Sequence, residues 1–272
     1  MRYLILRRIT QLSILLLYFG ANVWGWNIVK GDLSFSLLFD TIPLTDPFAT
    51  LQMLVAGAVI TTDLLVGILV VLVLYGLIGG RAYCSWVCPV NLITDLAAFL
   101  RRKLGIDRSG KKYLITKNFR YWFLGTMIIL SAIMGVAVFE FISPIGIMTR
   151  GVVFGIGMGW IFLLAIFLFD LFLVKNGWCG HMCPLGAAYS LIGSKSLIVV
   201  EHNHETCTNC GECKEVCPEK QVLNPIIHKK SGYIEGIECT NCGRCIEVCN
   251  DKSLKFSLRS YIKGAKNEKD AN

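Results

Sequence analysis

Long uninterrupted runs of apolar residues occupy the first two thirds of the chain and are absent from the last third. They cover residues 9–29, 64–80, 119–139 and 155–174. Each run is close to the roughly 20 residues that a helix needs to cross the hydrocarbon core of a bilayer. We therefore expect residues 1–200 to form an α-helical membrane domain with four transmembrane helices. A shorter apolar stretch, residues 51–60, is expected to be re-entrant or interfacial.

Basic residues are clustered along the chain, although the net charge of +8 at first suggests a nucleic-acid partner. Nine Lys or Arg residues lie between Arg81 and Arg120, and Arg2, Arg7 and Arg8 precede the first apolar run. The loop after that run is acidic instead. This pattern follows the positive-inside rule and argues against nucleic-acid binding. We expect a multi-pass protein of the bacterial cytoplasmic (inner) membrane with both termini in the cytoplasm.

The first apolar run is favoured as a retained anchor over a cleaved signal peptide. Its apolar part is long, and residues 19–24 (FGANVW) are a poor small-residue cleavage site.

All twelve cysteines fall into four groups, and the two C-terminal groups repeat one spacing, Cys-x2-Cys-x2-Cys-x3-Cys. This is the run of bacterial two-cluster ferredoxins, in which the fourth cysteine of each copy binds the other cluster. One [4Fe–4S] cluster is therefore expected on Cys207, Cys210, Cys213 and Cys249, and the second on Cys239, Cys242, Cys245 and Cys217. We expect residues 201–259 to form an α+β ferredoxin-like domain, followed by a charged tail, 260–272.

Zinc and disulfides are the alternative uses of these eight cysteines. Zinc needs only four ligands per site, and the Cys-Pro that ends the first copy fits an iron–sulfur run better. Disulfides are disfavoured in a reducing cytoplasm. Asn250 stands where proline often follows the last cysteine, and all ligands are present.

Two further cysteine pairs are Cys84 with Cys88 and Cys179 with Cys183. Each pair directly follows an aromatic residue, and a proline directly follows its second cysteine. Each pair comes after the second helix of a predicted hairpin, so the membrane domain reads as two duplicated hairpins. Functional sites tend to lie where such repeats meet. The four thiols are candidates for a metal or cluster site, for a redox pair that opens and closes, or for buried structural thiols. Covalent haem is not supported, since no CxxCH occurs.

Three other residues are weaker candidates for catalysis. Glu140 lies at the non-cytoplasmic end of the third predicted helix. There it would accept a proton from a substrate that is oxidised. Asp170 lies deep in the fourth apolar run, where a carboxylate is costly. His181 stands between Cys179 and Cys183 and would bind a metal or relay a proton. For each of them, a solvated or structural role is the alternative.

Four stretches of the chain resemble the NapH family, the membrane ferredoxin-type quinol dehydrogenase subunit of periplasmic nitrate reductase systems. They are residues 40–48 (DTIPLTDPF), 80–91 (GRAYCSWVCPVN), 178–186 (WCGHMCPLG) and 207–223, from CTNC to CPEKQVL. The larger NosR-type and CcoG-type membrane ferredoxins share the two CxxxCP motifs but carry extra soluble domains. The resemblance covers nearly the whole length of this chain.

The resemblance implies a subunit that takes electrons from quinol, either menaquinol or ubiquinol. It would pass them through iron–sulfur centres to a periplasmic NapG-like ferredoxin, a multihaem cytochrome and nitrate reductase. A CcoG-like role in copper reduction or metal assembly is the alternative, and a purely structural scaffold is a third. The electron path across the membrane stays open at this point, because the ferredoxin domain is expected on the side opposite the acceptor.

Overall fold

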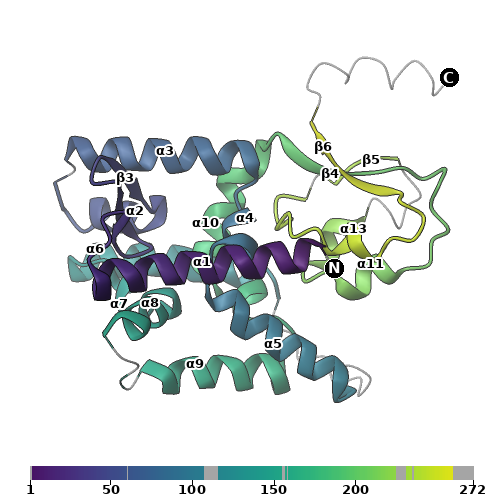
Figure 1. Ribbon diagram of the computed structural model, residues 1–272, viewed down its shortest axis with the longest axis horizontal. Coiled ribbons are helices and arrows are strands. Elements are labelled where there is room, and N and C mark those ends of the chain that lie inside the picture. The colour runs from purple at the N-terminus through teal and green to yellow at the C-terminus, as the bar shows by residue number, and fades with distance from the viewer. Residues whose placement is uncertain are drawn as a thin grey trace.

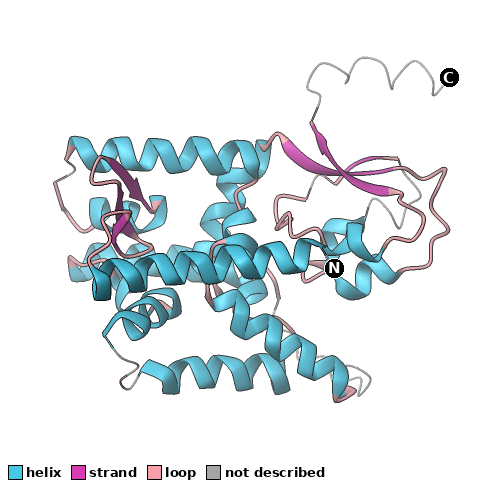
Figure 2. Ribbon diagram, viewed as in Figure 1, coloured by secondary structure: helices cyan, strands magenta, loops and turns pink. Residues whose placement is uncertain are grey.

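A computed structural model describes residues 2–59, 61–106, 116–154, 157, 159–224, 231–234 and 236–259. Helices run along its longest axis, with a small sheet at one end and the C-terminal domain at the other (Figure 1). Figure 2 shows that the long middle part is almost entirely helical and that strands occur only toward the two ends. The expected charged tail, 260–272, lies outside the described residues.

The first half of the helical part contains one long helix, a short sheet and four further helices. In order, they are α1 (Arg2–Trp24), β1 (Val29–Gly31), β2 (Phe35–Leu38), β3 (Ile42–Thr45), α2 (Pro47–Val55), α3 (Thr62–Ile78), α4 (Ala82–Trp86) and α5 (Val90–Lys103). The prediction of a helix over 9–29 has the wrong bounds. The helix already begins at Arg2, and it ends at Trp24 because Gly25 adopts a left-handed conformation with φ 69°.

The second half repeats much of this order without the sheet. It contains α6 (Phe119–Met134), α7 (Val138–Ile142), α8 (Pro144–Phe154), α9 (Gly159–Leu168), η2 (Phe169–Leu173), η3 (Trp178–Met182), α10 (Pro184–Ile192) and η4 (Gly193–Lys195). The helix expected to reach residue 139 stops at Met134, because Gly135 caps it with φ 66°. Residues 155, 156 and 158 of the fourth expected span lie outside the described residues.

Helix α1 is longer than the other apolar helices. Among the described residues, α1 alone is both long and apolar enough to cross a membrane by itself. Helices α3 and α6 are apolar but contain 17 and 16 residues, and the helix Gly159–Leu173 is shorter still. The structure therefore supports one candidate span directly, and the expectation of four spans stays a prediction.

In this helical part many apolar side chains are exposed and several polar side chains are buried, which is the reverse of the pattern in a soluble protein. Ile5, Leu69 and Ile133 are more than half exposed, whereas Arg7 and Gln11 are completely buried. Exposed apolar surface of this extent is unfavourable in water and favourable in an apolar surrounding.

The sheet after α1 was not predicted from the sequence. Its strands pair antiparallel in the order β1-β2-β3, with Phe35 opposite Thr45. Strand β3 packs on α3 at Gly67, where an added Cβ would lie 2.5 Å from the Thr45 Oγ1. This close approach fixes the position of the next residue, Asp46.

The C-terminal domain is a small α+β unit. It contains β4 (Ile198–His202), α11 (Glu212–Val216), η5 (Lys220–Leu223), β5 (Gly232–Tyr233), α13 (Arg244–Val248) and β6 (Leu254–Leu258). The sheet order is β5-β4-β6, and both pairings are antiparallel. Val200, Leu223, Ile234 and Leu254 form the apolar core of the domain.

Candidate functional site

The two cysteine copies of the C-terminal domain form the same type of loop. In the first copy Asn209 and Gly211 have positive φ angles of 57° and 83°. In the second copy Asn241 and Gly243 have φ angles of 47° and 73°. Asn and Gly are the residues that adopt this left-handed conformation most easily, so the repeated sequence CTNCG produces a repeated backbone. Such alternation turns backbone N–H groups toward a bound anion or cluster.

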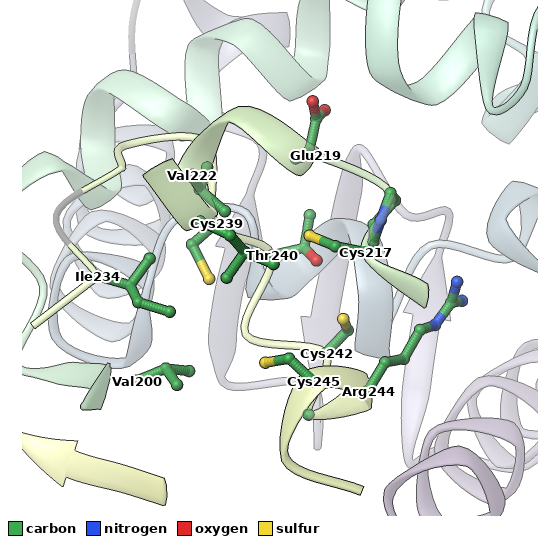
Figure 3. Close-up of a pocket in the computed structure, with 13 residues that line it drawn as sticks. Val200, Cys217, Glu219, Val222, Ile234, Cys239, Thr240, Cys242, Arg244 and Cys245 are labelled. Carbon is green, nitrogen blue, oxygen red and sulfur yellow. The ribbon is translucent and has the colours of Figure 1, made fainter. Parts of the chain in front are cut away.

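One cavity is lined by cysteines of both copies. Cys239, Cys242 and Cys245 of the second copy surround it together with Cys217, the last cysteine of the first copy. In Figure 3 these four side chains lie around the cavity, with Val200, Val222 and Ile234 toward the core. We call Cys239, Cys242 and Cys245 the proximal copy, because it lies against the helical part.

A second cavity has the reciprocal composition. It is lined by Cys207, Cys210 and Cys213, which we call the distal copy, and by Cys249, the last cysteine of the other copy. The structure thus brings together the two sets of four cysteines that the sequence pattern predicts. Four thiols around one cavity are the donor set that a [4Fe–4S] cluster requires, so the residues fit one cluster in each cavity.

The four remaining cysteines come together at the junction of the two helical halves. Cys88 and Cys183 are buried in one apolar cluster, and Cys84 and Cys179 pack against it. Two glycines make this junction possible. A Cβ on Gly80 would lie 1.7 Å from the Tyr189 carbonyl oxygen, and a Cβ on Gly193 would lie 2.0 Å from the Gly80 nitrogen. Only glycine permits such a close backbone contact.

The second cysteine of each pair lies at the start of the helix that follows it. Cys183 caps α10, where the Gly186 N–H donates to the Cys183 Sγ over 3.5 Å, whereas at the start of α5 the Asn91 N–H donates to the Cys88 carbonyl over 3.3 Å. Burial, together with the neighbouring Cys84, raises the pKa of Cys183 to about 12. Thiols with so high a pKa act as thiolate ligands only when a metal or cluster cation replaces their protons. Among the described residues, no group of three or more His, Cys, Asp or Glu side chains is placed to hold a single metal ion. A metal or cluster site on these four thiols therefore stays a prediction.

Helix α4, which carries Cys84, is bonded directly to the proximal copy. The Ser85 hydroxyl donates to the Thr240 carbonyl over 2.7 Å, and the Trp86 indole N–H donates to the Asn241 carbonyl over 3.0 Å. A small cavity lined by Cys84, Cys179 and Cys242 lies between the two sites. The four-thiol junction and the proximal cavity are therefore neighbours.

Glu219 is a site residue that sequence reasoning missed. Its carboxylate accepts from Arg81 over 2.7 Å and from Arg120 over 3.0 Å, and it also pairs with Lys117. Burial opposes its ionisation, but the charges of Arg81, Lys117 and Arg120 outweigh burial and lower the pKa of Glu219 to about 2. A signal was present: Glu219 directly follows Cys217-Pro218, and the three cations belong to the basic stretch 81–120.

A second buried carboxylate, Asp95 on α5, has the same kind of surroundings. It pairs with Arg7 over 2.7 Å, with Arg8, and with Arg244 of the C-terminal domain. Burial opposes the ionisation of Asp95, but Arg244 and Arg7 outweigh it and lower its pKa below the ordinary value. Asp95 and Glu219 therefore fix the C-terminal domain onto the helical part by charge.

Two of the weaker candidates interact with groups other than the cysteines. Glu140 accepts a hydrogen bond from the Ser34 hydroxyl over 2.8 Å, and the backbone carbonyl of the same residue accepts from Arg150. His181 is partly buried and faces Lys117, Glu219 and Arg120, although it stands between two cysteines in the chain.

Asp170 is fully buried at the entrance to the second cysteine motif. One carboxyl oxygen accepts from the Trp178 N–H over 3.0 Å, and the other oxygen, Oδ2, has no hydrogen-bond partner among the described residues. Because Trp178 directly precedes Cys179, this bond orders the turn that carries the cysteine.

Comparisons with known proteins agree with this architecture. A family model described as "4Fe-4S binding domain" matches residues 60–107 and 156–198, which include the two CxxxCP motifs, and a "4Fe-4S dicluster domain" matches residues 199–250. No solved structure matches the chain.

Several curated relatives cover most of the chain. The ferredoxin-type protein NapH of Haemophilus influenzae is 44% identical over 84% of this chain and 79% of the relative. NapH of Escherichia coli is 44% identical over 85% and 80%. The methylamine utilization ferredoxin-type protein MauN of Methylorubrum extorquens is 41% identical over 82% and 77%. The chain therefore belongs to the NapH family of ferredoxin-type electron-transport proteins with 4Fe-4S domains.

Proposed function

We propose that the protein is a membrane electron-transfer subunit that takes electrons from quinol and passes them through iron–sulfur centres toward a periplasmic partner. The bonding of α4 to the proximal loop carries this proposal. Because Ser85 and Trp86 hold Thr240 and Asn241, a cluster on the proximal copy lies next to the four-thiol junction of the membrane domain. Electron carriers that are adjacent in this way form a continuous route.

Four membrane spans are part of this proposal. The exposed apolar faces of α1, α3, α6 and α9 support it, since residues such as Leu12, Leu69, Ile133 and Ile161 face outward. Spans somewhat shorter than 20 residues are accommodated by local thinning of the bilayer. The basic residues Arg7, Arg81 and Arg120 contact the C-terminal domain, so the positive-inside rule supports a cytoplasmic location for that end.

Each cluster of the C-terminal domain supplies one-electron oxidation and reduction when it is bound. Cys207, Cys210, Cys213 and Cys249 would hold the distal cluster, and Cys217, Cys239, Cys242 and Cys245 the proximal one. The four membrane-domain thiols, Cys84, Cys88, Cys179 and Cys183, would hold a third centre. The match of a 4Fe-4S model to both of their segments supports iron and sulfide as its constituents.

Membership of the NapH family suggests which proteins accept the electrons. We propose a NapG-like periplasmic ferredoxin and a multihaem cytochrome as acceptors, with nitrate reductase at the end of the chain. The names of the MauN relatives refer to methylamine utilization instead. The quinol-oxidising core is thus proposed to be common, while the acceptor differs between systems.

Anaerobic iron and sulfide analysis, combined with EPR before and after addition of a menaquinol analogue, tests this function. We expect more than about eight irons per chain, a decrease toward eight in Cys84→Ser and Cys179→Ser, and cluster signals that grow on quinol addition. Copper bound by the four thiols and reduced in preference to any quinol reaction would favour the CcoG-like alternative, since thiolates also suit Cu(I).

A further inference from the structure

A buried carboxyl group, Asp46, lies inside the helical part beside a group of tyrosines. It follows β3 and caps α2, accepting from the Ala49 N–H over 3.2 Å, and it is only 8% exposed. The Tyr189 hydroxyl of α10 is a hydrogen-bond partner of its carboxyl. Helices α4 and α10 lie between this end of the molecule and the C-terminal domain (Figure 1).

The tyrosines connect Asp46 with the cysteine-bearing helix. The rings of Tyr83 and Tyr189 stack with centroids 4.8 Å apart, and Tyr75 contacts both edge-on at 5.7 and 5.3 Å. All three interact electrostatically with Asp46. Tyr83 directly precedes Cys84 in α4. The three rings therefore form one aromatic group between the cysteine-bearing helix α4 and Asp46, and the Tyr189 hydroxyl of this group is bonded to Asp46.

Asp46 is also coupled to groups beside the small sheet. The strongest charged influence on Asp46 is Glu140 of α7, which accepts from the Ser34 hydroxyl and is also affected by Asp32 and Arg150. On α1, Tyr18 donates to the Asp32 carbonyl over 3.3 Å. Among the described residues, the titratable and charged groups that act on Asp46 and Glu140 are thus the tyrosines, Asp32 and the cation Arg150.

Helix capping alone does not explain why a carboxyl group, and not a neutral amide, stands at position 46. Asn caps a helix about as well as Asp and carries no charge that burial would penalise. Asp95 and Glu219 are buried too, but three cations neutralise each of them, whereas the side chains that act most strongly on Asp46 are Glu140 and Tyr189. Burial and the neighbouring Glu140 raise the pKa of Asp46 to about 7. It is therefore a group that gains and loses a proton near neutral pH.

We propose that Asp46 is the proton acceptor of the membrane domain, receiving protons through Tyr189 and passing them to Glu140 and the small sheet. This inference rests on the proposed quinol reaction. There, a quinol breaks its two O–H bonds and becomes a quinone, giving two electrons to two one-electron iron–sulfur centres. The first proton converts the Asp46 carboxylate to the acid; the second follows after Asp46 has transferred the first to Glu140.

Redox-difference infrared spectroscopy of the full cluster-loaded chain tests this role independently of turnover. The electrons that dithionite adds to the clusters increase the negative charge near Asp46 and should favour its protonated form. When dithionite reduces the wild type at pH 7, we therefore expect a protonated-carboxyl C=O band to appear. Asp46→Asn should lose this band and retain the EPR signals of the clusters, because Asn preserves the helix cap. Asp40→Asn is the matched control: Asp40 is exposed on the same sheet, is paired with Lys30, and its replacement should leave the band unchanged.

Kinetics of cluster reduction by quinol supply the second readout. The wild-type rate should rise with pH up to about 7 and then level off, as the carboxylate form of Asp46 becomes dominant. Asp46→Asn should lower the rate about a hundredfold and remove this inflection. Tyr189→Phe should lower it less and shift the inflection.

Two results separate this inference from the proposed function. If the Asp46→Asn variant keeps both the carboxyl band and the pH inflection, Asp46 is not the proton acceptor and the inference is overturned. If the band depends on Asp46 under dithionite but quinol fails to reduce the wild-type clusters, the redox-linked proton site stands and the quinol donor is wrong.

Discussion

The proximal and distal cysteine copies have the same ligand spacing and the same left-handed Asn and Gly positions, but their surroundings differ. In the distal copy Cys210 is exposed, and its loop is held within the domain by Asp251, which accepts from the Thr208 N–H and hydroxyl. In the proximal copy Thr240 and Asn241 are bonded to helices α3 and α4. Ligand spacing thus indicates which cofactor is bound, and the surroundings indicate where each cluster would stand on the proposed electron route.

The largest difference is expected when one cluster is removed. Cys242→Ser should abolish quinol reduction of the distal cluster, because that cluster is then separated from the membrane domain. Cys210→Ser should leave the proximal cluster reducible by quinol. EPR after quinol, with dithionite as the control for cluster content, distinguishes the two variants. Equal behaviour of both variants would mean that the two copies are equivalent and would contradict the proposed order.

The next largest difference concerns the carboxylates that hold the two copies. Glu219→Gln removes the carboxylate that Arg81, Lys117 and Arg120 share, although Arg120 keeps its ion pair with Glu238. The change should destabilise the docked domain by about 3–5 kcal/mol, because Arg81 and Arg120 are buried. Asp251→Asn, at a half-buried position beside the distal copy, keeps a side-chain oxygen that can accept from Thr208 and should change the unfolding midpoint little. Urea unfolding in detergent micelles measures both. A Glu219→Gln variant as stable as the wild type would show that the charge cluster is not what holds the domain.

A smaller difference is expected for the paired asparagines. Replacement by alanine strains the left-handed backbone in both copies, by about 1–2 kcal/mol each. Asn241→Ala also removes the hydrogen bonds from its side-chain amide to Ile78 and Ile198, of 2.9 and 3.0 Å. It should therefore be more destabilising than Asn209→Ala by about 1–2 kcal/mol. Equal losses in thermal unfolding would indicate that the proximal loop is not anchored through Asn241.

The local patterns of the sequence predicted much of the chemistry. The family and the ferredoxin-type domain are confirmed, because eight cysteines at fixed spacing leave few alternatives. The apolar runs correctly predicted the positions of α3, α6 and the described part of the last predicted span. Helix α1 begins earlier, and α6 ends earlier, than expected. Ligand identities, four spans and the role of the CxxxCP thiols stay predictions.

Features that depend on contacts between distant residues were not predictable in this way. Glu219 lies 138 positions from Arg81, and Asp95 lies 88 positions from Arg7, so no local pattern links the partners. The sheet was missed because its strands contain only three or four residues and Pro43 stands inside β3. Asp46 was included only in the acidic loop and in a family motif, since its tyrosine neighbours come from three separate helices.

The most direct test of the electron route is the order in which quinol reduces the two clusters. Rapid-freeze EPR after mixing the full chain with a menaquinol analogue, with Cys242→Ser and Cys210→Ser used to assign the signals, measures this order. The account predicts that the proximal cluster is reduced first and the distal cluster afterwards, at a rate that depends on the first. Reduction of the distal cluster first, or its reduction at an unchanged rate in Cys242→Ser, would contradict it.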